Sequence, residues 1–227
     1  MPLLEIACFT PESAILASQA GADRIELCEN REAGGTTPAL EALLHVKRHV
    51  AIPVYVMIRP RGGDFNYSDA EFERMLADVA SFMPMVDGFV FGVLDIANDV
   101  DIARTTELVR MAAPLPCTFH RAFDEARDML QALEDVVSCG CKNILTSGGL
   151  PDAAAGMSML RKLVKSAGER IQVVVGGGVR ASNIIELLEG TGALAYHSSA
   201  IKGDSMCTEV DVGETRDLKR LISGAPT

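Results

Sequence analysis

Short apolar runs alternate with longer amphipathic stretches along the whole chain. The runs are rich in Val, Ile, Leu and Phe and recur every roughly 20 to 30 residues, a spacing typical of strand–helix units in a parallel sheet. We therefore predict strands at Leu3–Cys8, Arg24–Glu29, Val54–Arg59, Gly88–Leu94, Cys117–His120, Asn143–Ser147, Gln172–Gly176 and Leu194–Ser198.

The stretches between these runs follow the helical period of about 3.6 residues, with an apolar stripe along one side. Ser68 followed three residues later by Glu71 is the capping-box pattern that begins a helix. Gly190 and Gly192 stand where a helix is expected to stop. The clearest helices are predicted within residues 72–83, 129–137 and 184–188, and only a short final helix within Gly213–Ser223.

Polar residues stand at the ends of apolar runs in both halves of the chain. The strings are MIRPRGGDF (57–65), CTFHRAFD (117–124), ILTSGG (144–149), VVVGGGV (173–179) and AYHSSA (195–200). A strand–helix barrel builds one pocket from several strand ends in this way, whereas a doubly wound open sheet, the alternative, concentrates its site at one switch point. We predict an α/β fold, a (β/α)8 TIM barrel, as a single domain over residues 1–227.

Composition and charge narrow the classes of partner. Hydrophobic residues make up 48% and charged residues 23% of the chain, as in ordinary globular proteins. The net charge of −10 argues against a nucleic-acid or anionic-membrane surface. No apolar run reaches the roughly 20 residues of a membrane span. The start of the chain lacks the basic segment of a signal peptide, so we expect a cytoplasmic location and reduced thiols at the six cysteines.

Two arginines follow the third predicted strand. Alternation directs Arg59 and Arg61 into the barrel, on the same face as Tyr55 and Met57. Two guanidinium groups at a barrel mouth are costly to desolvate without anions. They predict either a clamp for a carboxylate or phosphate or a structural ion network. The acidic residues considered for that network are Glu5, Glu26 and Asp64.

Carboxylates and histidines stand at other strand ends. Glu26 on the second strand is expected either to pair with Arg59 or to act as a general acid or base. His120 and His197 end the fifth and eighth strands, and Asp124 follows in the loop after His120. A histidine can serve as an acid, a base or a metal ligand near neutral pH, and its competing interpretation is a satisfied core group.

The seventh and eighth strands end in small residues. Gly177 and Gly178 follow the seventh strand, and Ser198 and Ser199 close the eighth. In barrels these two loops often hold a phosphate through backbone N–H groups. The pattern predicts an anion-binding site, with a simple tight turn as the alternative.

Cys8 and Cys28 end the first two strands and offer soft ligands for Cu(I). Alternation aligns Cys28 with Glu26 but Cys8 with the apolar Ile6, so buried core thiols are the competing interpretation. The CGC string at 139–141 lies between a helix end and a strand start, on the face away from the pocket. Without a CxxC pair or an HExxH string, zinc is disfavoured.

Seven strings taken together resemble the CutC family, described as copper-homeostasis proteins. They are GADRIELC (21–28), GGTTP (34–38), MIRPRGGDFNYSD (57–69), TFHRAFD (118–124), LTSGG (145–149), GGGV (176–179) and HSSA (197–200). They occur in the family order across nearly the whole chain. MIRPRGGDF and TFHRAFD are highly specific strings, whereas GGGV alone is not.

The resemblance implies a cytoplasmic (β/α)8 barrel linked to copper handling and assembled as a homodimer or higher homo-oligomer. It implies copper as cofactor, bound as Cu(I) by Cys8 and Cys28. It also implies a pocket at the strand ends. The matching pocket residues are Glu26, Arg59, Arg61, His120, Asp124 and His197. The segment 201–210 is shorter than in many relatives, so a loop that covers the mouth or contacts a partner is expected to be trimmed.

Two functions of different classes follow from these observations. The first is a copper-homeostasis protein that binds or handles Cu(I). The second is an enzyme that acts on a small anionic metabolite, phosphorylated ones included, by acid/base chemistry. The partner is accordingly a copper ion or a small anionic ligand, and neither a nucleic acid nor a membrane.

Overall fold

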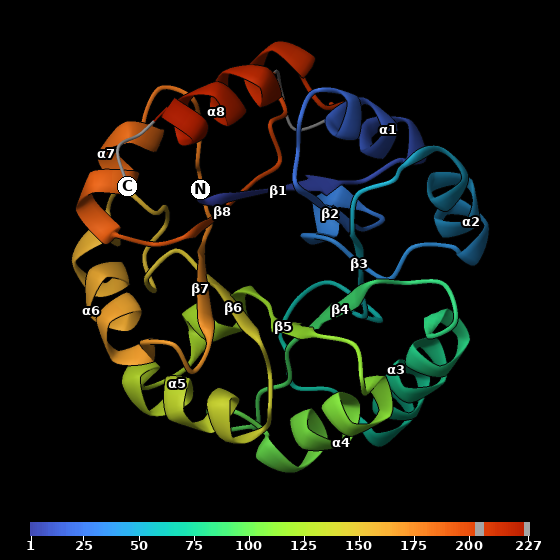
Figure 1. Cartoon of the computed structure of the whole chain (residues 1–227). Helices are drawn as coiled ribbons and strands as arrows, with labels where there is room; N and C mark the ends of the chain where they lie inside the picture. The colour runs from blue at the N-terminus through green and yellow to red at the C-terminus, as the bar shows by residue number, and fades with distance from the viewer. Residues whose placement is uncertain (203–206, 225–227) are drawn as a thin grey trace.

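The computed structural model of the protein describes residues 1–202 and 207–224. Eight parallel strands close into a barrel in sequence order, and the helices form a ring outside it (Figure 1). β1 pairs with both β2 and β8, which closes the cylinder. The predicted (β/α)8 barrel is confirmed, and the open doubly wound sheet is excluded.

The strands are short. They are β1 (Leu3–Cys8), β2 (Arg24–Leu27), β3 (Val54–Met57), β4 (Gly88–Phe91), β5 (Cys117–Phe119), β6 (Asn143–Thr146), β7 (Gln172–Val175) and β8 (Ala195–Ser198). The helices are α1 (Pro11–Gln19), α2 (Leu40–His49), α3 (Asp69–Phe82), α4 (Ile102–Ala112), α5 (Met129–Ser138), α6 (Met157–Ala167), α7 (Ile184–Thr191) and α8 (Val212–Gly224), with the short 3-10 helices η1 (Arg31–Ala33) and η2 (Arg121–Glu125). None of the described helices combines the length and apolar character needed to cross a bilayer.

Six of the predicted strands extend one to three residues past the observed carboxyl ends. Some of these residues still bond to the neighbouring strand, as the His120 N–H does to the Phe91 carbonyl at 2.8 Å. Beyond β3, the Arg59 N–H donates to the Thr37 hydroxyl at 2.9 Å, and the Arg59 carbonyl accepts from the Thr37 N–H at 2.9 Å. His120 likewise lies just after β5. These side chains of the site therefore stand on the first loop residues rather than within the strands.

Helix ends follow the local sequence in two cases and depart from it in one. The Ser68 hydroxyl accepts the Glu71 N–H, and the Glu71 carboxylate accepts the Ser68 N–H, so the predicted capping box begins α3. Gly192 ends α7 with a left-handed φ of 67°. The predicted stop at Gly190 is wrong, since this glycine lies inside α7 and a Cβ there would lie 2.2 Å from Met157 Sδ.

The last helix is longer than the sequence indicated. α8 has 13 residues, and the Asp211 carboxylate caps its first turn by accepting the Glu214 N–H at 2.7 Å. Leu218 and Ile222 are fully buried on its inner side. The prediction of a short final helix is wrong because the cap and this apolar stripe extend the helix on both sides of the expected segment.

Alternation divides the strand side chains into two packed layers, as predicted for the third strand. One layer lies between the sheet and the helices and includes Val54, Val56 and Ile58. The other lies inside the barrel, where Tyr55 and Met57 pack with Cys28 and Val90.

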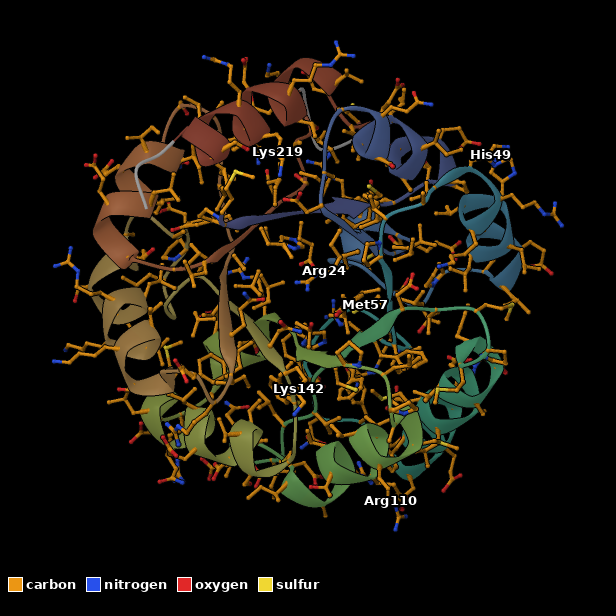
Figure 2. All side chains as sticks on the ribbon, in the orientation of Figure 1. Arg24, His49, Met57, Arg110, Lys142 and Lys219 are labelled. Carbon is orange, nitrogen blue, oxygen red and sulfur yellow. The ribbon has the colours of Figure 1, made fainter. Side chains whose placement is uncertain are left out.

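Polar and aromatic side chains fill the amino-terminal part of the barrel interior. The Arg24 guanidinium lies 4.4 Å from the centre of the Tyr55 ring, close to the barrel axis in Figure 2. Gly88 makes room for that ring, because a Cβ at this position would lie 2.7 Å from it. The Asn143 amide donates to the Thr118 hydroxyl at 3.1 Å. With this end filled, the open space lies toward the carboxyl ends of the strands.

Candidate functional site

A cavity of about 110 Å³ opens at the carboxyl end of the barrel. Its lining residues are Ala7, Phe9, Glu26, Cys28, Gly34, Met57, Arg59, Phe65, His120, Arg121, Leu145 and His197. A larger hollow of about 260 Å³ lies at the opposite end, and Glu169 is its one ionisable lining residue. The groups able to carry chemistry therefore gather in the smaller cavity.

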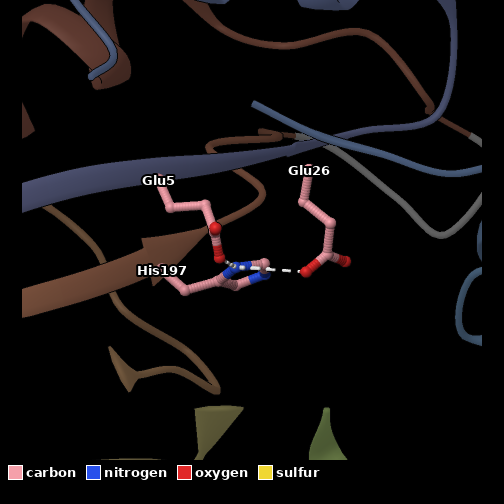
Figure 3. Close-up of side chains that lie close together, drawn as sticks. All are labelled: Glu5, Glu26 and His197. Atoms are coloured by element: carbon pink, nitrogen blue, oxygen red, sulfur yellow. Dashed lines mark hydrogen bonds and ion pairs between the residues drawn. The ribbon is translucent and has the colours of Figure 1, made fainter. Parts of the chain in front are cut away.

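His197 lies between two buried carboxylates (Figure 3). Its Nδ1 is 2.7 Å from Glu5 Oε1 and 3.8 Å from Glu26 Oε2. The three residues come from the adjacent strands β8, β1 and β2, and Glu5 is in register with His197. Arg24 Nε donates to the second oxygen of Glu5 at 2.5 Å. One guanidinium and one imidazole thus face two carboxylates in a buried cluster.

The surroundings separate the pKa values within this cluster. Burial acts to raise the pKa of Glu5, but Arg24 and His197 outweigh it and lower the pKa to about 2. Burial, supported by the charge of Glu5, raises the pKa of Glu26. Burial acts to lower the pKa of His197, but Glu26 and Glu5 outweigh it and raise the pKa above its ordinary value. Glu5 is therefore a fixed anion, whereas Glu26 is the more basic carboxylate.

One oxygen of Glu26 accepts a hydrogen bond, and the other faces His197 at 3.8 Å without one in the described part of the chain. The Cys28 thiol donates to Oε1 at 3.2 Å, while Oε2 is buried without a hydrogen-bond partner among the described residues. Burial, followed by the charge of Glu26, raises the pKa of Cys28 well above its ordinary value. Cys28 therefore stays a thiol, and Glu26 is the group able to accept a proton.

His120 lies across the cavity from this cluster and is neutral. Its Nδ1 accepts the Ala122 N–H at 3.2 Å, and its ring centre is 4.9 Å from that of Phe65. Burial, together with the positive charge of Arg59, lowers the pKa of His120 to about 3. Its Nε2 is buried and has no partner in the described part of the chain.

Arg59 is buried and held by backbone. Its Nη atoms donate to the carbonyls of Ala33, Gly35 and Gly63 at 2.9, 3.3 and 2.8 Å, and its guanidinium lies 4.6 Å from the Phe65 ring centre. Its Nε makes no hydrogen bond of good geometry to the described residues, although the Tyr67 side chain lies close enough to interact with the guanidinium. No described carboxylate lies within 4.0 Å of it.

The predicted pairing of Arg59 with Glu5 or Glu26 is wrong. Arg24 takes that place, because it starts β2 directly beside Glu5 in the register of the sheet. Arg24 is also the residue that the sequence reasoning missed. Strand alternation could have placed Arg24 inside the barrel, since it is two residues from Glu26 and four from Cys28, on the same inner face.

Arg61 does not join Arg59 in a clamp. Its Nε lies 2.6 Å from Glu71 Oε1 and its Nη2 lies 3.0 Å from Asp64 Oδ1, at the surface. The ion network with Asp64 is the interpretation that holds for Arg61. The clamp prediction extended strand alternation to position 61, but the strand ends at Met57 and the chain then turns.

Asp124 forms its hydrogen bonds with neighbouring loops and does not line the cavity. Its carboxylate accepts the Thr146 hydroxyl at 2.5 Å and the Ser147 N–H at 3.0 Å, and it pairs with Arg121 Nε at 2.8 Å. It therefore ties η2 to the end of β6. Its partner Arg121 lines the cavity, which the sequence reasoning had not assigned.

The small residues after β7 and at the end of β8 lie outside the cavity lining. The Ser198 hydroxyl donates to the Val179 carbonyl at 2.7 Å and accepts from Arg180 at 3.0 Å, so it is used within the protein. Gly177 and Gly178 have left-handed φ values of 91° and 71°, as a tight turn requires. Anion binding by Gly177, Gly178, Ser198 and Ser199 stays a prediction.

Cys8 and Cys28 pack in different layers. Cys8 lies in the layer between sheet and helices, whereas Cys28 lies inside the barrel and lines the cavity. Strand alternation separates the two sulfur atoms, which opposes the predicted pair as joint ligands of one Cu(I) ion. All six cysteines are free thiols, and Cys139 and Cys141 precede β6, at the amino end of the barrel as predicted.

Glu5, Glu26 and His197 also present possible metal-ligand atoms within 4.8 Å of one another. Carboxylate and imidazole donors suit a harder divalent ion, whereas Cu(I) prefers sulfur. Arg24 already pairs with Glu5, and its positive charge opposes a cation at this place. The cluster therefore fits proton transfer better than metal binding.

Comparison with known proteins identifies the family. The sequence profile described as the CutC family matches residues 2–202. A CutC family protein of Chromobacterium violaceum is 45% identical over 199 residues, which is 87% of this chain and 81% of that protein. The human copper homeostasis protein cutC homolog is 45% identical over 199 residues, 87% of this chain and 73% of that protein.

A solved structure agrees with both matches. The crystal structure of the copper homeostasis protein CutC from Streptococcus agalactiae has a TM-score of 0.84 and 31% identity, and covers 88% of this chain and 99% of that chain. Profile, sequence and structure thus point to the same group of proteins. The chain belongs to the CutC family.

Proposed function

We propose that this protein is an enzyme that transfers protons on a small anionic compound bound at the carboxyl end of the barrel. The observation that carries the proposal is that Arg59, a buried cation without a described carboxylate partner, lines the same cavity as Glu26 and His197. A ligand anion supplies the charge that a buried guanidinium lacks.

The acid/base part of the proposal rests on Glu26 and His197. The pKa values of both residues are raised above their ordinary values. Burial raises the pKa of Glu26. For His197, burial acts to lower the pKa, but the carboxylates of Glu26 and Glu5 raise it by more. A carboxylate with raised pKa is a better base, and perturbed pairs of this kind gather at catalytic sites. Glu5 holds the imidazole of His197 in place, and Arg24 in turn holds Glu5.

The size of the cavity limits the substrate to a small molecule. Its volume of about 110 Å³ is below the usual range of drug-sized ligand pockets, which begins at about 300 Å³. Arg121 also lines the cavity, with its side chain 44% exposed, but its charge is balanced by Asp124 at 2.8 Å. Arg59 is therefore the cation of the cavity lining that a ligand anion would neutralise.

Metabolite capture tests this function. Purified protein is incubated with a metabolite extract, and retained compounds are identified by mass spectrometry and then tested for turnover. We expect small anions to be retained by the wild type and by Arg61→Ala, and lost from Arg59→Ala. Glu26→Gln should bind the compound without converting it. Retention of no compound, or equal retention by Arg59→Ala, would overturn the proposal.

Copper handling is the second candidate, and one observation favours it. The Cys28 thiol and the Met57 thioether are neighbours inside the barrel and line the same cavity, and soft sulfur ligands suit Cu(I). The human relative is named a copper homeostasis protein. In this candidate copper is cargo, and binding displaces the proton that Cys28 shares with Glu26.

Titration with Cu(I) against a competing chelator under reducing conditions tests the copper candidate. We expect Cys28→Ser to lower the affinity at least about tenfold, whereas Cys8→Ser leaves it unchanged because that sulfur lies in the other layer. Equal affinity of the wild type and Cys28→Ser would remove this candidate.

The cytoplasmic location and the homo-oligomeric state implied by the resemblance belong to the same proposal. Free thiols at all six cysteines fit a reducing compartment. Cell fractionation and light scattering on the purified protein test these two points. The expected trimming of the segment 201–210 includes residues 203–206, which lie outside the described residues.

A further inference from the structure

Three buried polar atoms on cavity-lining residues lack a hydrogen-bond partner among the described residues: Glu26 Oε2, Arg59 Nε and His120 Nε2. Buried polar groups in folded proteins are nearly always paired, so each exception requires an explanation. Here one acceptor and two potential donors belong to one cavity, which indicates a ligand that pairs with all three.

The hydrogen bonds of His120 fix which nitrogen carries its proton. Nδ1 accepts the Ala122 N–H at 3.2 Å, so this nitrogen is unprotonated. A neutral imidazole then carries its proton on Nε2. Nε2 is therefore an N–H donor without an acceptor, held in place by the Ala122 contact and by the neighbouring Phe65 ring.

Arg59 provides the second donor on the same wall. Both Arg59 and His120 contact the Phe65 ring, at 4.6 and 4.9 Å from its centre. Three backbone carbonyls fix the Nη atoms of Arg59 and leave the Nε–H unpaired. A preorganised pair of N–H donors, one of them cationic, is the arrangement that stabilises a developing oxyanion.

Glu26 provides the base in the same cavity. β2 pairs with β3, so Glu26 lies beside the strand that Arg59 follows, whereas His120 follows β5, farther round the barrel. A molecule in the cavity thus meets two N–H donors and one carboxylate. A carbonyl oxygen beside an acidic C–H matches this set of groups.

Resting on the proposed acid/base function, we infer that the substrate is a small anionic hydroxycarbonyl compound or 2-oxo acid. Its carbonyl oxygen binds Arg59 Nε–H and His120 Nε2–H while Glu26 removes a proton from the adjacent carbon. The C–H bond breaks, and the proton forms an O–H bond on Glu26 Oε2. The C–H electron pair becomes the carbon–carbon double bond of an enolate, and the carbonyl oxygen takes the negative charge.

The reaction is completed without another reactant. The proton on Glu26 exchanges with water, and Glu26 then delivers a proton either to the same carbon or to the former carbonyl carbon of a hydroxycarbonyl compound, with a matching shift of the hydroxyl proton. The outcome is exchange or isomerisation, and no oxidant or reductant is consumed. In this scheme Arg59 and His120 are catalytic residues, and His197 is a positioning residue for Glu26.

Proton exchange with solvent tests the inference directly. The full chain is incubated in D2O with pyruvate, 2-oxobutyrate, hydroxypyruvate or tartronate semialdehyde, and loss of the proton signal next to the carbonyl is followed by NMR. We expect exchange of at least one probe about 100-fold or more above the buffer rate, lost in Glu26→Gln and unchanged in Arg61→Ala. Absence of exchange with all four probes would overturn the inference.

Two substitutions of His120 separate catalysis from structure. His120→Asn keeps an acceptor near Nδ1 for the Ala122 N–H but removes the Nε2–H, and we expect exchange to fall about 100-fold. His120→Gln loses that acceptor but carries an N–H near the Nε2 position, and should keep most of the exchange. Equal loss in both variants would show a structural role only and would overturn the inference.

Metabolite capture and deuterium exchange together distinguish a failure of this inference from a failure of the proposed function. A captured metabolite that is turned over without deuterium on carbon would contradict the enolate and leave the enzyme proposal standing. Capture of no small anion would contradict the enzyme proposal itself.

Discussion

The Cys28 N–H donates a hydrogen bond to the Cys8 carbonyl at 2.9 Å, yet the two side chains lie on opposite faces of the barrel wall. Adjacent backbone therefore does not bring the two sulfur atoms into one site. The cavity contains the thiol of Cys28 only, beside Glu26. Only Cys28 can therefore contact a ligand in the cavity, whereas Cys8 is part of the core between the sheet and the helices.

Neither buried thiol should behave as a reactive cysteine. Burial, followed by the charge of Glu26, raises the pKa of both Cys8 and Cys28 well above the ordinary value, and the thiolate is the reactive form. We expect iodoacetamide to modify the half-buried Cys207 in the folded protein and to spare Cys8 and Cys28 until urea is added. Peptide mass spectrometry measures this. Rapid modification of Cys28 would contradict it.

His120 should make stability fall in acid. Its pKa is about 3 in the folded protein, through burial and Arg59, against an ordinary value of 6.5. Between these values the unfolded chain binds a proton that the folded chain does not, so the free energy of unfolding decreases as pH falls. Between pH 6 and 4 we expect the wild type to lose about 1.4 kcal/mol per pH unit more than His120→Asn. Urea unfolding of both proteins measures this difference, and parallel curves would contradict it.

Glu5 should be needed for stability because it is the counter-ion of buried Arg24. The side chains of Glu5 and Arg24 are 0% and 6% exposed, and His197 contacts the same carboxylate. We expect Glu5→Gln to lower the free energy of unfolding by about 3–5 kcal/mol, because it leaves a buried cation unpaired. The control is Glu134→Gln, which breaks an exposed pair with Arg170 and should leave the free energy of unfolding nearly unchanged. Equal losses would contradict the assignment.

Gly92 should position His120 without contacting a ligand. A Cβ at Gly92 would lie 2.5 Å from His120 Nδ1, so Gly92→Ala must displace the ring. We expect proton exchange to fall by up to about 100-fold, as for a misplaced catalytic group. The imidazole signals in ¹⁵N NMR should lose the pattern of a single Nε2–H tautomer. Gly224→Ala is the matched control, since no atom of the described residues lies within 4 Å of its Cβ position.

Periodicity predicted the barrel and the gathering of Glu26, His120 and His197, because strand alternation and strand ends are local properties. It failed at Arg61, where the chain had already left the strand and a Glu71 carboxylate was in reach. Alternation still placed Arg59, two residues beyond the end of β3, in the cavity lining, but it no longer applied at Arg61.

The ion pairs of the site could not be predicted from spacing. Glu5 meets Arg24 and His197 through the register between β1 and its two neighbours, and register depends on how the whole barrel closes. Likewise, Arg59 is held by the carbonyls of Ala33, Gly35 and Gly63, three loop positions whose backbone path the sequence pattern does not specify.

The side chains of Arg24 and Tyr55 pack against each other in the amino-terminal part of the barrel interior, which leaves the carboxyl end as the approach to the cavity. Substrate and product are then expected to use the same approach. Turnover should be sensitive to accumulated product, and compounds shaped like the product are a starting point for inhibitors.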